Sequence, residues 1–404
     1  MKILFVTCNY LPGKKGGIEN YTHWLATLLI QRNYEVGVAV LNKIEKNLTE
    51  YEGVKIYPLD RKFEAFQTLL RNSNFDVCHF QEYSSFGGIE LLWFEEARKY
   101  CNKVFFTFHL PYLTCYKGDF RYKGVADCND FSSTDRCLSC CIASKLNYRQ
   151  AKGSFYNFGV DMFIPLIKGA KVIDNLRDKI ENRKKELDGL METCDTIFIY
   201  GKWFTKLLRE NGYTATLIKE ISHISDTNKT TRQPREPALY HKLLFVGRIE
   251  KKKGLHLICD ALNRVSEPQI QLDVYGNIVD QDYYTSCQKA FNFNYKGLLP
   301  RNELIQQFSH YDFLVLPSVF TEMNSLVLRE AFYEQLPVIV STAKGNKDVV
   351  TDGVNGFLFE YDNAKDLAST IDKAYDLKKK GWHPTFTYPE NPERDIEEII
   401  SYYR

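Results

Sequence analysis

The chain has 404 residues, of which 44% are hydrophobic and 26% charged, with a formal net charge of +2. This length suits two domains that each bury a core, and the near-neutral charge gives no argument for nucleic-acid binding. No apolar run approaches the roughly 18 residues of a membrane helix and no signal peptide is recognisable, so we expect a cytoplasmic protein.

The N-terminal half alternates strand-like and helix-like segments. Lys2 to Thr7 is a short apolar strand, and a loop ending in Gly16 and Gly17 leads into a helical pattern from 18 to 30. Glycines at a helix N-terminus leave N–H groups open to an anion, although a surface turn explains the same pair. Further strands at 34–41, 54–57, 76–80 and 103–108 predict a parallel sheet with ligands beyond its carboxyl edge, where His109 follows a strand.

An aromatic, polar insert at 112–145 interrupts this alternation. Its first four cysteines have the spacing Cys-x12-Cys-x8-Cys-x2-Cys, which suits a tetrahedral structural zinc that would order a segment poor in apolar residues. Free or regulatory thiols and a disulfide are the alternatives, and the fifth cysteine is either left over or replaces the fourth. The five are Cys115, Cys128, Cys137, Cys140 and Cys141.

The middle of the chain predicts a helix and then a domain boundary. Mixed charges at 157–190 indicate a solvated helix, while the apolar and basic run at 162–171 could touch a membrane surface. Residues 225–240 are polar with two prolines and read as a linker. We therefore divide the chain into an N-terminal domain at 1–224, a second domain at 241–385 and a C-terminal helix at 386–404.

The second domain begins with a strand at 243–246 and a basic loop. The loop runs from Gly247 to Gly254 and contains Arg248 and Lys253. A guanidinium offers a planar fork and an ammonium a point charge, and both suit a diphosphate. Because three consecutive lysines are also common on solvated faces, the functional interpretation of this loop depends on the glycine at each of its ends.

The segment from 312 to 341 predicts a strand at 313–316, a loop, a helix at 326–334 and a strand at 338–340. The loop contains Glu322, and Asn324 and Ser325 can cap the helix. Glu330 lies further along, and eight helical residues rise roughly 12 Å. Free N–H groups at the helix start suit an anion between the two carboxylates.

These motifs together resemble the retaining glycosyltransferases of the family 4 type. The resemblance covers nearly the whole chain and implies an α/β fold of two doubly wound Rossmann-like domains facing a central cleft, called GT-B. It also implies that the Cys-rich insert belongs to the first domain and that the C-terminal helix packs back on it. The motifs that carry it are Gly247-Arg248 through Lys253-Gly254, Leu316-Pro317-Ser318 with Glu322 and Glu330-Ala331, Pro337-Val338-Ile339, and 352–358.

The resemblance implies a role for each matching residue. Arg248 and Lys253 would hold the donor diphosphate and stabilise the leaving nucleotide, so no catalytic Mg²⁺ is implied. Glu322 would contact sugar hydroxyls and Glu330 the ribose, while His109 would lie beside the transferred sugar and the acceptor. The remaining donor-binding positions are Gly16, Gly17, Gly247, Asn324, Ser325 and Leu326.

The expected reaction is transfer of a sugar, with retention, from a UDP- or GDP-sugar to a glycan or lipid-linked glycan acceptor. Peripheral contact with the inner face of a membrane is a further expectation. Two other classes stay open: a sugar-nucleotide epimerase or phosphorylase-like enzyme of the same fold, and a non-catalytic sugar-nucleotide or zinc-binding module. The chain departs from the family pattern at 323–325, where Met-Asn-Ser replaces Gly-Phe-Gly.

Overall fold

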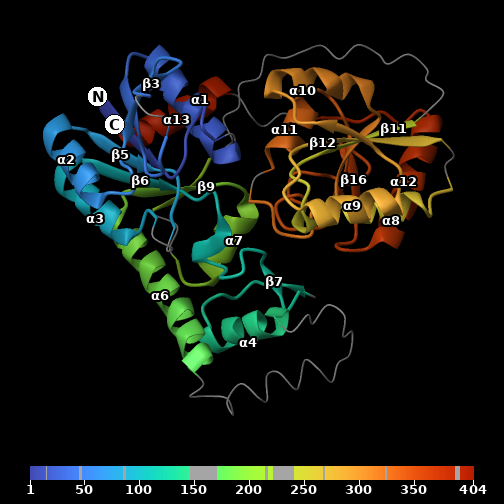
Figure 1. The fold of residues 1–404 in the computed structure, drawn as a ribbon, viewed down its shortest axis with the longest axis horizontal. Helices are drawn as coiled ribbons and strands as arrows, with labels where there is room; N and C mark the ends of the chain where they lie inside the picture. The colour runs from blue at the N-terminus through green and yellow to red at the C-terminus, as the bar shows by residue number, and fades with distance from the viewer. Residues whose placement is uncertain are drawn as a thin grey trace. The chain divides into compact units, whose positions relative to one another are not determined.

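The computed structural model describes residues 1–14, 16–44, 48–84, 88–124, 126–145, 171–213, 217–221, 241–266, 269–323, 325–386 and 392–404. The chain divides into two compact units, one of Met1–Asp226 with Glu390–Arg404 and one of Thr227–Pro389 (Figure 1). The linker proposed at 225–240 lies outside the described residues, and so does nearly all of the apolar and basic run at 162–171.

The first unit is built on an eight-stranded sheet in the order β10-β9-β6-β5-β1-β2-β4-β3. All neighbours pair in parallel except β3 and β4. The mostly parallel pairing confirms the α/β class. The strands are β1 (Lys2–Thr7), β2 (Glu35–Val40), β3 (Glu50–Tyr51), β4 (Val54–Pro58), β5 (Val77–Phe80), β6 (Lys103–Thr107), β9 (Thr196–Ile199) and β10 (Ile218–Glu220).

Successive residues of a strand point to opposite sides of the sheet, and helices pack against the side chains on both of these faces. Phe5 of β1 packs in one core with α1 and with Ile399 of the C-terminal helix α13. On the other face, Phe80 of β5 stacks on Phe94 of α3 with 3.7 Å between ring centroids. The C-terminal segment is thus part of the first unit. The helices are α1 (Gly17–Gln31), α2 (Phe63–Ser73), α3 (Leu91–Tyr100), α6 (Lys171–Thr193), α7 (Lys202–Glu210) and α13 (Pro392–Tyr403).

The Cys-rich insert forms a small substructure against α6. It consists of the 3₁₀ turn η1 (Pro111–Leu113), a hairpin of β7 (Arg121–Tyr122) and β8 (Ala126–Asp127), and helix α4 (Thr134–Lys145). Leu138 of α4 packs with Leu176 and Ile180 of α6. This is the place where the sequence predicts an interruption of the βα alternation.

The second unit has a six-stranded, wholly parallel sheet in the order β13-β12-β11-β14-β15-β16. This is the strand order of a doubly wound Rossmann sheet. Both units are therefore Rossmann-like, as predicted. The strands are β11 (His241–Val246), β12 (Ile270–Tyr275), β13 (Asn294–Gly297), β14 (Phe313–Leu316), β15 (Val338–Ser341) and β16 (Gly356–Phe359).

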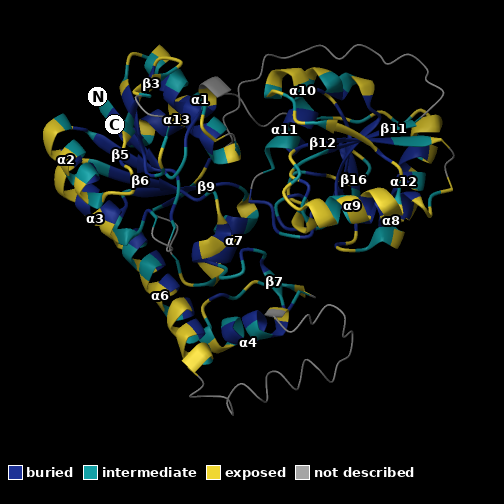
Figure 2. Cartoon of the chain, viewed as in Figure 1, coloured by how far each residue is buried: buried dark blue, intermediate teal, exposed yellow. Residues whose placement is uncertain are grey.

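Two cores lie on the two faces of this sheet. Phe313 and Val315 of β14 pack in the core that contains α8 and α12, whereas Leu314 packs with Leu328 of α11. The inner strands β14 and β15 are buried along their whole length, whereas the edge strand β13 is mostly exposed (Figure 2). The helices are η4 (Lys251–Lys253), α8 (Leu255–Leu262), α9 (Gln281–Ala290), α10 (Arg301–Gln307), η5 (Phe308–His310), α11 (Leu326–Tyr333) and α12 (Ala364–Lys379).

No helix within the described ranges is both long enough and apolar enough to span a bilayer. The predicted membrane contact and cellular location stay predictions.

Candidate functional site

Two loops of the second unit meet at the carboxyl edge of its sheet, because β11 and β14 are neighbouring strands. The backbone N–H of Val319 donates to the carbonyl of Lys252 at 2.9 Å. Gly254 has a positive φ of 78°, and a Cβ there would lie 2.0 Å from the carbonyl oxygen of Pro317. The glycine that ends the basic loop thus has a steric reason, since only glycine permits this approach.

The structure brings Lys253 and Glu322 together at this edge. Lys253 Nζ donates to Glu322 Oε1 at 2.7 Å, and Ser318 Oγ donates to the same oxygen at 2.7 Å. Glu322 is only 9% exposed, so its charge is stabilised by this ammonium and hydroxyl. Gly345 has φ 90°, and a Cβ there would meet the carbonyl oxygen of Glu322 at 1.7 Å, which fixes the backbone behind the carboxylate.

Arg248 follows the same strand but has a different partner. Its side chain is 64% exposed, and Nη2 lies 2.7 Å from Glu250 Oε1. Its guanidinium is thus paired with Glu250 rather than with Glu322. Gly247 packs beside the turn after β12, because a Cβ on Gly276 would lie 1.9 Å from the Gly247 carbonyl oxygen.

Helix α11 begins as predicted, but the prediction that Ser325 caps it through its side chain is wrong. Ser325 occupies the N-cap position with φ −82° and ψ 105°, yet its side chain makes no capping hydrogen bond. The N–H groups of the first turn, which starts at Leu326, therefore do not donate to that hydroxyl. Asn324 lies outside the described residues.

Glu330 of α11 is held by an arginine that the sequence reasoning did not single out. Arg301, the first residue of α10, donates from Nε to Glu330 Oε1 at 2.7 Å. Glu330 is 8% exposed. The two residues are 29 positions apart, and no local pattern links an arginine at a helix start to a distant glutamate.

In the first unit, the glycine pair stands at the start of α1. Gly16 is the N-cap residue and Gly17 the first helical residue. A Cβ on Gly16 would lie 2.4 Å from Oε2 of Glu19, whose pKa is raised by burial. The end of β1 is anchored by Glu82, which accepts from Thr7 Oγ1 at 2.9 Å and from the Cys8 N–H at 2.6 Å. Glu82 is a second residue that the sequence patterns missed.

His109 is a partly buried imidazole at the carboxyl edge of the first sheet. Its Nε2 lies 3.1 Å from Oε1 of Gln81, and the rings of Tyr21 and Tyr200 lie 5.0 and 5.5 Å away between centroids. Burial lowers the pKa of His109 to about 3. The amide oxygen of Gln81 can only accept a hydrogen bond, so His109 Nε2 is the donor and carries the single proton of the neutral ring. The other ring nitrogen, Nδ1, therefore has a lone pair that can accept a hydrogen bond.

The lowered pKa of His109 makes stability depend on pH. An unperturbed histidine has a pKa of 6.5, so below that pH the unfolded chain binds a proton that the folded chain rejects. The stability from neutral His109 is complete above pH 6.5 and is lost as the pH falls toward 3, by at most about 1.4 kcal/mol per unit.

We therefore expect the free energy of unfolding of the wild type, minus that of His109→Asn, to fall by about 1 kcal/mol between pH 6.5 and 5.5. Chemical denaturation at each pH measures it. The buried His79 is present in both proteins, so the larger, burial-caused part of its lowered pKa cancels in this difference, and only the smaller part due to the charge of His109 does not. A difference that stays constant across this range would show that the His109 pKa is not lowered.

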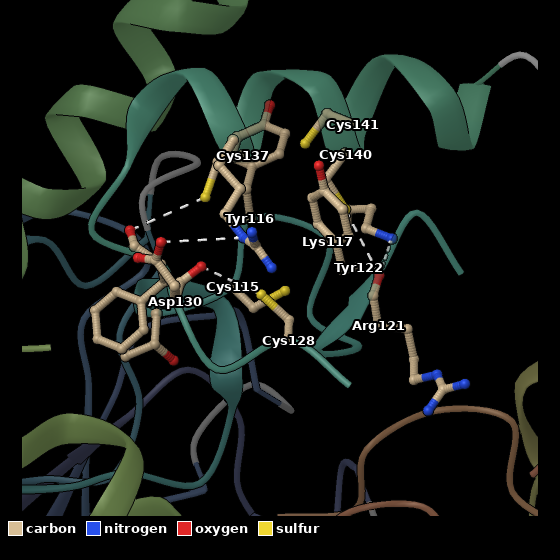
Figure 3. A pocket seen from close by; sticks show the side chains of 13 residues that line it. Cys115, Tyr116, Lys117, Arg121, Tyr122, Cys128, Asp130, Cys137, Cys140 and Cys141 are labelled. Carbon is tan, nitrogen blue, oxygen red and sulfur yellow. Dashed lines mark hydrogen bonds and ion pairs between the residues drawn. The ribbon is translucent and has the colours of Figure 1, made fainter. Parts of the chain in front are cut away.

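The cysteines of the insert line one small cavity in the first unit (Figure 3). All eleven cysteines of the chain are among the described residues, and none of them is paired in a disulfide there. Across the described ranges, no three His, Cys, Asp or Glu side chains already stand in a metal-binding arrangement. Zinc at Cys115, Cys128, Cys137 and Cys140 remains a prediction.

Comparison with solved structures defines the fold class. The Anabaena protein HepE, solved in complex with UDP and glucose, aligns over 99% of this chain and 95% of its own, with a TM-score of 0.63 and 18% identity. The chain thus has the GT-B fold of two Rossmann-like domains.

Sequence comparison adds a family match for the second unit. Residues 226–381 match the family model described as glycosyl transferases group 1. Glycogen synthase of Alkaliphilus metalliredigens is 32% identical over 218 residues, which are 50% of this chain and 44% of that enzyme. Sulfoquinovosyl transferase SQD2 of Arabidopsis thaliana is 30% identical over 145 residues, which are 34% of this chain and 26% of that enzyme. The chain thus aligns with less than half of the length of these curated relatives.

Proposed function

We propose that this protein is a retaining glycosyltransferase of the family 4 type. It transfers a sugar from a nucleotide-diphosphate donor, UDP- or GDP-linked, to a glycan or lipid-linked glycan acceptor. The observation that carries the proposal is the contact of Lys253, Glu322 and Ser318 at neighbouring strand ends. Carboxyl edges of such sheets are where ligands bind, and two of the curated relatives are named as a sulfoquinovosyl transferase and a glycogen synthase.

The donor would lie along the loop and helix that join Glu322 to Glu330. Lys253 and Arg248 supply positive charge for the diphosphate, and the N–H groups at the start of α11 add donors. Glu322 accepts from sugar hydroxyls and Glu330 from ribose hydroxyls. HepE, a structural neighbour, was solved in complex with UDP and with UDP-glucose, which favours a uridine donor.

The chemistry proposed is departure of the nucleotide diphosphate with acceptor attack on the same face of the sugar. The largest contribution is electrostatic, since Lys253 and Arg248 stabilise the charge that develops on the leaving diphosphate. The donor phosphate takes the acceptor proton. In the first unit, neutral His109 offers Nδ1 to a hydroxyl of the transferred sugar or acceptor, and Gly16 and Gly17 keep their predicted role at the donor diphosphate.

A thermal-shift panel of UDP, GDP and ADP, each with and without its sugar, tests the donor site. A ligand at one hundred times its Kd adds about 2.7 kcal/mol of stability, which corresponds to roughly 5–10 °C for a unit of this size. We expect one base to produce that shift and the other two to produce little. If none of the six ligands raises the melting temperature, the donor-site assignment is wrong.

Product analysis then separates the proposed reaction from the other classes. Incubation with the stabilising donor and no acceptor should leave the nucleotide sugar chemically unchanged over many minutes. An epimerised nucleotide sugar would identify an epimerase instead. Binding without turnover on any glycan acceptor would favour the non-catalytic module.

A further inference from the structure

The Cys-rich insert of the first unit encloses a cavity that the proposed reaction does not use. All five of its cysteines line the cavity, together with Lys117, Arg121 and Arg136, between η1, the β7–β8 hairpin and α4 (Figure 3). Its volume is about 20 Å³, which is the space of one water-sized sphere. A single ion fits there.

Separate elements bring four of the sulfurs to this cavity. Cys115 follows η1 and Cys128 follows β8. Cys137 and Cys140 lie one turn apart on α4, so their side chains share a face of that helix. Four thiolates from a loop, a hairpin and a helix are a common ligand set for tetrahedral zinc.

Backbone groups already point at two of these sulfurs. The N–H of Lys123 lies 3.1 Å from Cys140 Sγ, and the N–H of Phe120 lies 3.4 Å from Cys115 Sγ. Donors of this kind stabilise a thiolate more than a thiol, and they orient the ligands of a bound metal from the outer shell.

Cationic side chains also lie beside the sulfurs. Arg183 Nη2 is 3.8 Å from Cys137 Sγ, and Lys117 lines the same cavity. Four thiolates around one Zn²⁺ carry two net negative charges, so two nearby cations balance the site.

The fifth cysteine has different surroundings. Cys141 belongs to the apolar cluster of Leu138, Leu176 and Ile180 that joins α4 to α6. Residues three and four apart both share a helix face, so the spacing from Cys137 does not show whether Cys140 or Cys141 is the fourth ligand. Cys137, one of the proposed ligands, packs against the same apolar cluster as Cys141, so the distinction rests on the N–H of Lys123 that points at Cys140 Sγ.

We propose that the insert binds one structural Zn²⁺ through Cys115, Cys128, Cys137 and Cys140, and that Cys141 is a packing residue. Cys128 Sγ donates to the carbonyl of Asp130 at 3.3 Å. Binding turns the four thiols toward the cavity, replaces four S–H bonds with four Zn–S bonds and releases four protons. The metal then ties η1, which follows His109 closely in the chain, to α4.

Metal analysis of the full chain, purified with reductant and without chelator, tests the site. We expect about one zinc per chain in the wild type and in Cys141→Ser, and a loss of at least fivefold in Cys115→Ser and Cys137→Ser. Wild-type protein with no zinc, even after addition of zinc under reducing conditions, would overturn the proposal. Iron in place of zinc would overturn it as well, and loss of zinc in Cys141→Ser but not in Cys140→Ser would overturn the ligand assignment.

Cobalt binding provides a measurement that does not depend on variants that fail to fold. Co²⁺ titrated into chelator-treated wild type should give the visible absorption of tetrahedral thiolate coordination, saturate at one equivalent and vanish when zinc is added. The absence of this absorption would also contradict the proposal. The nucleotide thermal shifts are measured on the same samples, so failure of the zinc site is distinguishable from failure of the donor site.

Discussion

Replacing Lys253 with alanine should lower the kcat of sugar transfer by about 10²–10³-fold. The reason is the loss of a positive group aimed at the charge that develops on the leaving diphosphate, a loss that typically costs about 2.7–4 kcal/mol in the transition state. Lys253 is held in place by Glu322 at 2.7 Å and lies 4.7 Å from the ring centroid of Phe320. Steady-state kinetics at saturating donor and acceptor measure the effect.

Lys251→Ala is the matched control, because it removes the same charge from the same three-lysine turn at an exposed position. We expect its kcat to stay within about twofold of the wild type, as for other surface substitutions. Equal losses in the two variants would mean that the loop acts only through its overall charge. An unchanged kcat in Lys253→Ala would remove this lysine from the proposed mechanism.

Lys253 also shows what the sequence could predict. The turn between β11 and α8 is marked locally by glycines and basic residues, and β14, α11 and β15 were expected within one residue of their observed bounds. These elements are short, strongly apolar or strongly periodic, so local patterns decide them. The pairing of β11 with β14, which brings Lys253 to Glu322, follows from the strand order of a doubly wound sheet.

The parts that sequence reasoning missed all depend on contacts between distant segments. Gln81 reaches His109 from 28 positions away and Glu82 reaches Thr7 from 75. Arg301 meets Glu330 only because the fold brings α10 and α11 together. The two residues are 29 positions apart, so no short window of sequence contains both. Ser325 shows the opposite error, since a residue type favoured at helix N-caps occupies that position without making the bond.

Replacing Glu330 with alanine should raise the KM for the donor by about 10–100-fold and change kcat by less than about threefold. The ribose lies away from the reacting carbon, so its hydrogen bonds are the same in ground and transition states, and losing them weakens uniform binding. A hydrogen bond to a carboxylate is worth about 1.5–3 kcal/mol, which gives this range. Glu303→Ala, which removes an exposed carboxylate from α10, is the control.

A donor that lacks one ribose hydroxyl makes this prediction specific. The wild type should bind the deoxy donor about tenfold or more weakly, whereas Glu330→Ala should bind both donors alike, because the partner of that hydroxyl is already gone. The discrimination that Arg301→Gln shows against the deoxy donor should lie between that of the wild type and that of Glu330→Ala. This variant keeps the Glu330 carboxylate but loses the 2.7 Å hydrogen bond that fixes its orientation. If Glu330→Ala still discriminates against the deoxy donor, the ribose is bound elsewhere, and the donor does not lie along α11 in the direction proposed.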